Sequence, residues 1–95
     1  MKVLISKIRL DIPYSKSLKD KRRVLKALKD RIWNKFRASI SETDGQNSIQ
    51  RAEMGIVYVS NDRQMLDRII NKIIDLIEDS YPGLLYDYEF VIEDY

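Results

Sequence analysis

Apolar residues in this chain of 95 residues switch between two spacings, in an order that leaves few folds open. Residues 3–12 alternate between apolar and charged side chains, and residues 18–36 place apolar side chains at helical spacing with no internal Gly or Pro. The same reasoning predicts weak alternation in residues 37–43, a strand in residues 50–60, a helix in residues 61–82 and a last strand around residues 86–93. This order, strand-helix-strand-strand-helix-strand, predicts a ferredoxin-like split β-α-β fold.

Right-handed crossovers in such a chain place both helices on one face of a four-stranded antiparallel sheet with strand order 4-1-3-2. We expect residues 1–95 to form a single domain, because a chain of this length has no residues to spare for a second one. Ser17 with Asp20, and Asn61 with Gln64, have the spacing of helix caps. The face of the sheet opposite the helices is left open, so it is a first candidate for function.

The chain contains no cysteine and no histidine. It can form no disulfide, and it has no thiolate or imidazole to ligate zinc, attack a carbonyl or shuttle protons near neutral pH. Cys-His and Ser-His-Asp catalysis are therefore excluded. We predict a protein that is not an enzyme, uses no cofactor, has no metal site and has no evident small-molecule substrate.

Two enzyme-like or metal-binding alternatives are weaker. Acylphosphatases share the predicted fold, but residues 13–17 lack the glycine-rich phosphate cradle of those enzymes. Acidic residues near the end of the chain suggest Mg²⁺ binding. Cross-strand ion pairs with Lys7 and Arg9 explain two of these acids, Asp87 and Glu89, better. The acidic group as a whole consists of Asp87, Glu89, Glu93 and Asp94.

The net charge of +2 conceals a strong division along the chain. Residues 1–38 hold 13 basic and 3 acidic residues, a net of +10, whereas residues 39–95 hold 4 basic and 12 acidic residues, a net of −8. Basic residues follow i, i+3, i+4 and i+7 spacing on the first predicted helix, next to a helix N-terminus that favours anions. A row of this kind suits phosphates along a nucleic-acid backbone. The candidate RNA-contacting residues are Lys16, Lys19, Arg22, Arg23, Lys26 and Lys29.

The alternative for this row is a solvated face with no binding role. Acids of the second predicted helix could also neutralise it by ion pairing. Those acids are Asp67, Asp75, Glu78 and Asp79. The residues alone do not decide between these alternatives.

The open sheet face carries no aromatic residue on its two central strands, which disfavours base stacking in the manner of an RRM. The aromatic residues Tyr58, Tyr86, Tyr88 and Phe90 are expected to face the helices as core. Trp33 and Phe36 are expected on the buried side of the first helix. One end of the open face is apolar, which predicts a homodimer interface, with scattered exposed valines on a monomer as the alternative. The predicted interface residues are Val3, Ile5, Val57 and Val59.

Three motifs together resemble the YlxP-like family of small bacterial proteins of unknown function. They are the basic run in residues 17–26, Gln50-Arg51-Ala52, and Val59-Ser60-Asn61-Asp62. The resemblance implies a ferredoxin-like fold, no established enzymatic activity and, from the neighbourhood of family genes, a ribosome-linked role in contact with RNA. The chain departs from the family where Ile49 stands for a common tryptophan and Gly45 for a frequent histidine.

The beginning of the chain reaches Lys7 and Arg9 before an apolar run of signal-peptide length can form, and no run of about 20 apolar residues occurs. We therefore expect a cytoplasmic protein with no membrane partner. The leading hypothesis is a non-enzymatic homodimer that contacts RNA or a ribosomal particle through the first helix. The alternative is a homodimeric protein-interaction module that uses the open sheet face.

Overall fold

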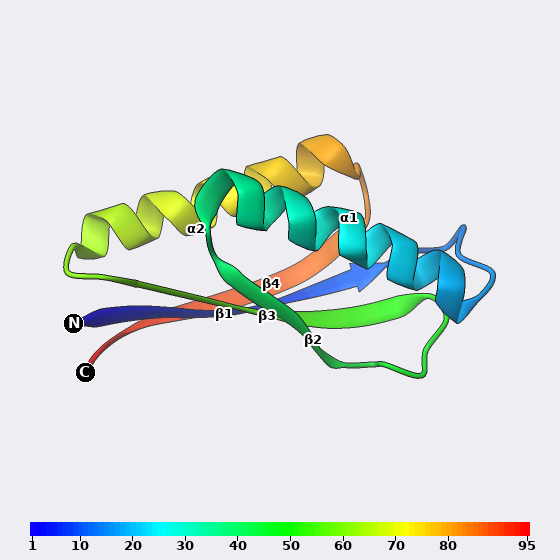
Figure 1. The fold of residues 1–95 in the computed structure, drawn as a ribbon, viewed down its shortest axis with the longest axis horizontal. Coiled ribbons are helices and arrows are strands. Elements are labelled where there is room, and N and C mark those ends of the chain that lie inside the picture. The colour runs from blue at the N-terminus through cyan, green and yellow to red at the C-terminus, as the bar shows by residue number, and fades with distance from the viewer.

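A computed structural model describes residues 1–95 in full, and its elements follow the predicted order (Figure 1). Neither helix is both long enough and apolar enough to cross a membrane. The elements are β1 (Lys2–Asp11), α1 (Leu18–Phe36), β2 (Ser39–Asp44), β3 (Arg51–Ser60), α2 (Arg63–Ser80) and β4 (Leu85–Asp94).

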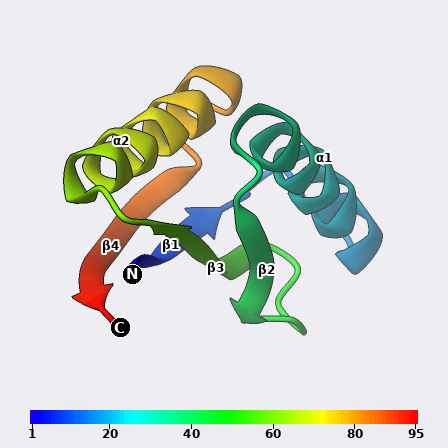
Figure 2. The same ribbon diagram turned by 60° about the vertical axis from the view of Figure 1, so that its left-hand side comes forward.

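The four strands form one antiparallel sheet in the order β2-β3-β1-β4, which is the predicted order read from the other edge. Both helices cover the same face of the sheet, and the opposite face is bare (Figure 2). The predicted ferredoxin-like fold is therefore confirmed, with β1 and β3 in the centre and β2 and β4 at the edges.

The core lies between the sheet and the two helices. On β1 and β3 every second side chain points into it, as the alternation predicted, and on the helices the buried positions repeat at helical spacing. Each fully buried aliphatic side chain stabilises the fold by roughly 1.5–3 kcal/mol. The largest fully buried apolar side chains are Leu4, Ile8, Leu10, Ile12, Leu28, Ile32, Met54, Ile56, Leu66, Ile70 and Ile73.

The helix ends confirm one predicted cap and correct the other. Ser17 caps α1, because its hydroxyl accepts a hydrogen bond of 3.0 Å from the backbone N–H of Asp20. The cap of α2 is Asp62 and not Asn61: the Asp62 carboxylate accepts from the backbone N–H of Gln64 at 3.0 Å and of Met65 at 3.3 Å. The negative charge of a carboxylate at this position also interacts favourably with the positive end of the helix dipole.

One buried residue in the fold is charged. Lys21 lies on α1 in line with the apolar residues Leu25 and Leu28, and only 1% of its surface is exposed. Its ammonium donates to the Glu42 carboxylate on β2 at 3.0 Å, to the Gly45 carbonyl at 2.7 Å and to the Arg51 carbonyl at 3.2 Å. A lysine ammonium has three N–H donors, so these bonds satisfy it completely. Lys21 therefore ties α1 to both ends of the loop that joins β2 to β3.

We predict that Lys21→Met destabilises the fold by about 2–4 kcal/mol, because it leaves a partly buried carboxylate and two carbonyls without their donor. Lys19→Met, on the exposed side of the same turn, serves as the matched control and should change stability by less than about 0.5 kcal/mol. Equilibrium unfolding in urea measures both. Equal effects of the two substitutions would show that the three bonds of Lys21 contribute no net stability.

Candidate nucleic-acid interface

The six basic residues predicted to contact RNA form one surface, which we call the basic stripe: Lys16, Lys19, Arg22, Arg23, Lys26 and Lys29. Lys16 directly precedes α1, and the other five lie on the helix. All are exposed except Lys29, which is half-buried. The buried side of α1 is occupied by Lys21 and the apolar residues in line with it, so the stripe is directed away from the core.

Pairing within the molecule leaves most of the basic stripe free. Lys26 forms an ion pair of 2.9 Å with Asp30, one helical turn further on. The hydrogen bond from Lys26 to Asp30, and then the negative charge of Asp30, raise the pKa of Lys26 above its ordinary value. None of the other stripe residues has an ion-pair partner. The stripe therefore presents several cations that no acid of this chain neutralises by direct contact.

The acids of α2 do not pair with the stripe, so the neutralisation considered from the sequence is absent. Arg31 marks the side of α1 that faces α2, since its guanidinium donates to the Ser80 hydroxyl at 2.8 Å. Trp33 marks the opposite side, because it lines a groove together with Ser39 and Ile40 beside β2. Residues two positions apart on an α-helix point in directions that differ by roughly 200°, so Arg31 and Trp33 lie on nearly opposite sides of α1. Lys26 and Lys29 lie on the Trp33 side by their i, i+4 and i, i+7 spacing, away from α2.

The N-terminus of α1 is a less favourable site for an anion than the sequence suggested. Asp20 lies at this end of the helix. Its carboxylate accepts a hydrogen bond of 3.0 Å from the backbone N–H of Lys16, and its own backbone N–H donates to the Ser17 hydroxyl. Ser15 is buried, with its hydroxyl donating to the Ser17 carbonyl at 3.1 Å. Part of this end of the helix is therefore already occupied by acceptors of the chain itself.

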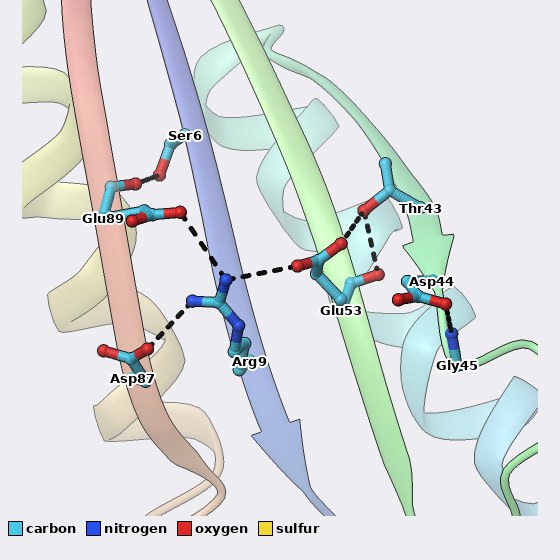
Figure 3. Close-up of polar contacts among 8 residues, drawn as sticks. All are labelled: Ser6, Arg9, Thr43, Asp44, Gly45, Glu53, Asp87 and Glu89. Atoms are coloured by element: carbon cyan, nitrogen blue, oxygen red, sulfur yellow. Dashed lines mark hydrogen bonds and ion pairs between the residues drawn. The ribbon is translucent and has the colours of Figure 1, made fainter.

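The charged end of the open sheet face is centred on Arg9 (Figure 3). Its guanidinium lies 2.8 Å from the Asp87 carboxylate, 3.4 Å from Glu53 and 3.5 Å from Glu89. Burial alone would lower the pKa of Arg9, but the three neighbouring carboxylates raise it above its ordinary value. The predicted cross-strand ion pairing of Asp87 and Glu89 is confirmed for Arg9. These acids surround a cation of the protein itself, which removes the reason to assign them to a metal.

The apolar end of the open face is a continuous patch across the sheet. Val3 pairs with Val59, and Ile5 pairs with Val57 in the register of β1 and β3. Ile5 is 43% exposed, Val57 42% and Val59 55%, while Val3 is half-buried. The structure adds Val91, which is 50% exposed and lies opposite Ile5 on β4. The sequence contained a signal for it, because Val91 alternates in phase with the open-face residues of β4.

Four aromatic residues expected in the core are exposed instead. Tyr88 and Phe90 keep the helix-facing phase opposite Ile8 and Ser6, but they lie on the edge strand β4, where α2 covers them only in part. An irregularity in register at Arg9/Leu10 turns Tyr86 out of phase, and its ring lies 5.7 Å from the Arg51 guanidinium. Trp33 is 51% exposed on α1. The other two expected core aromatics, Tyr58 and Phe36, are partly buried against the core.

The open face is not an RRM-type stacking surface, because β1 and β3 present no aromatic residue there. Its outward positions on these two strands are Val3, Ile5, Lys7, Arg9, Arg51, Glu53, Gly55, Val57 and Val59. The basic stripe and the apolar patch lie on opposite sides of the molecule, since both helices cover the other face of the sheet (Figure 2).

Comparison with solved structures places the chain among ferredoxin-like proteins. A de novo designed protein with a ferredoxin fold superposes with a TM-score of 0.58 at 13% identity, over 100% of this chain and 87% of the other. A dimeric ferredoxin-like protein from an uncultured marine organism superposes with a TM-score of 0.52 at 20% identity, over 98% of this chain and 93% of the other. At these identities the likeness concerns the fold alone.

Comparison with protein families is more specific than the likeness to solved structures. Residues 3–90 match the model of a family described as protein of unknown function (DUF503), and the chain belongs to that family. It is also 42% identical over 68 residues to the uncharacterized protein YlxP of Bacillus subtilis (strain 168), which covers 72% of this chain and 73% of that protein. The predicted resemblance to YlxP-like proteins is thus confirmed.

Proposed function

We propose that this protein is a non-enzymatic RNA-binding protein that contacts phosphates through the basic stripe of α1. The observation that carries the proposal is that the stripe is exposed except for the half-buried Lys29 and, apart from Lys26, lacks ion-pair partners. Cations held on one rigid helix and left unneutralised bind a polyanion by releasing its counterions. The side of α1 that carries the stripe lies away from the acids of α2, which keeps their negative charge at a distance.

Charge reversal in the stripe tests the proposal. Arg22→Glu combined with Arg23→Glu should weaken binding to a short single-stranded RNA at least tenfold near 50 mM salt. It should also reduce the slope of log affinity against log salt by about 1–2. Fluorescence anisotropy of a labelled RNA measures both quantities.

The matched control reverses the same amount of charge on α2, through Arg68→Glu with Lys72→Glu. Both residues are exposed and neither forms an ion pair. If the two double variants lose affinity equally, binding reflects net charge and the stripe has no special role. If the unchanged protein does not bind RNA at low salt, the proposal is wrong.

The biological source of the RNA is a separate question, and we propose ribosomal particles. Support comes from the ribosome-linked role that the resemblance to YlxP-like proteins implies through the neighbourhood of family genes, and from the polyanionic surface that such particles present. The protein should co-sediment with ribosomal particles at low salt and leave them at high salt, because phosphate contacts weaken steeply with ionic strength. Sedimentation that does not respond to salt would contradict contact through the stripe.

A second function, homodimerisation through the apolar patch, has its own support. An exposed apolar patch on a small domain commonly marks an interface. Val3, Ile5, Val57, Val59 and Val91 form such a patch on strands that bear no helix on that side. A structurally similar protein is described as dimeric. Pairing of two identical patches about a twofold axis would remove these side chains from water.

We predict that the protein sediments as a dimer at micromolar concentration and that Val57→Lys makes it monomeric, because a lysine would place a charge within the buried patch. Ile49→Lys is the control, since Ile49 is 44% exposed, close to the 42% of Val57, but lies in the loop between β2 and β3. A monomer in the unchanged protein would rule out this interface. A dimer that survives Val57→Lys would place the contact elsewhere.

A further inference from the structure

Trp33 lies at the end of the basic stripe and is unusually open to solvent. It follows Lys26 by seven positions and Lys29 by four, so the three side chains lie along one side of α1. Tryptophan is highly buried on average in folded proteins, yet 51% of this side chain is exposed. Trp33 is not among the apolar residues that pack against the core.

The indole borders a groove between the C-terminal half of α1 and the beginning of β2. The groove measures about 290 Å³, close to the lower limit of about 300 Å³ for pockets that take drug-sized ligands. Trp33 and Ile40 supply apolar surface, while Lys29 and Ser39 supply a cation and a hydroxyl. The one acid in the groove, Asp30, is already paired with Lys26.

Arg37 supports the indole from another side. It ends α1 in the left-handed conformation, with φ of 57°, and its backbone N–H donates to the Trp33 carbonyl at 2.8 Å. Its guanidinium carbon lies 5.4 Å from the centre of the Trp33 ring. Because Arg37 does not line the groove, this contact leaves the groove side of the indole free. The cation also adds positive charge at the end of the stripe.

We propose that this groove binds one base of single-stranded RNA, stacked on Trp33, while the phosphates next to that base contact Lys26 and Lys29. The proposal rests on the RNA-binding function proposed above and specifies the form of its ligand. An exposed aromatic ring in line with cations is the combination by which proteins hold single strands, since every base has a face that stacks. Of the two lysines, Lys29 has no ion-pair partner, and Lys26 pairs only with the exposed Asp30. Duplex RNA keeps its bases stacked on one another and would leave the groove empty. The chain therefore discriminates in favour of unpaired RNA.

Tryptophan fluorescence tests the contact directly, because Trp33 is the one tryptophan of the chain. A single-stranded RNA of about ten nucleotides should quench this fluorescence as it binds. An oligonucleotide of the same length with abasic positions has the same phosphates without the bases, so it should bind through the stripe with little quenching. A hairpin duplex should likewise quench little.

Substitution separates this proposal from the function on which it rests. Trp33→Ala should lower affinity for single-stranded RNA about tenfold and leave affinity for the abasic oligonucleotide and the salt slope unchanged, whereas Trp33→Phe should retain most of the affinity. Circular dichroism confirms that each variant is folded. RNA binding that is salt-dependent, causes no quenching and is indifferent to Trp33→Ala would overturn the stacking proposal while leaving phosphate contact intact. No RNA binding at low salt would overturn both.

Discussion

The bonds of Lys21 determine how α1 presents its other charges. The ammonium is held by Glu42 and by the carbonyls of Gly45 and Arg51, and these bonds, together with the burial of Leu25 and Leu28 in line with Lys21, favour one rotation of the helix about its axis. In that orientation Lys21 is buried in line with the apolar residues of α1, and Lys19 and Arg22 are exposed to solvent. A buried ion pair is seldom a large net source of stability, but it is costly to break. Its contribution here is to fix the position of the basic stripe relative to the sheet.

The division of charge along the sequence is resolved in two different ways in space. Part of the positive first half is matched within the fold: Lys2 pairs with Asp94, Arg9 with carboxylates of β3 and β4, and Lys21 with Glu42. These pairs hold neighbouring strands and the hairpin together. Apart from Lys26, which pairs with Asp30, the basic stripe is not matched, because α1 turns it toward β2 while α2 lies on its other side. The unmatched charge is therefore concentrated on one surface, and the near-neutral net charge of the chain conceals it.

The sequence was sufficient for the fold because its apolar spacing is clear in every element except residues 37–43, and strand order follows once the crossovers are right-handed. It was insufficient where the burial of a side chain depends on which other elements of the fold cover it. Tyr88 has the phase of a core residue, but it lies on the edge strand β4, and alternation does not report how far α2 covers that edge. Tyr86 departs from the alternation of β4 because the register between β1 and β4 is irregular at this point, and no local sequence pattern predicts that irregularity. Lys21 occupies a core position at i−4 from Leu25, a signal that its charge concealed.

The two proposed surfaces are compatible because they use different layers of the fold. Pairing through Val57 and its neighbours would join two sheets and leave α1 on the outside of each protomer, so the basic stripe would stay accessible. Such a dimer would carry two stripes on one rigid body. Two weak phosphate-binding sites held at a fixed separation bind a long polyanion more tightly than either alone, provided that the polyanion can reach both. A domain with little core to spare for a deep binding cleft would in this way gain affinity by duplication, and the apolar patch and the stripe would then serve one function.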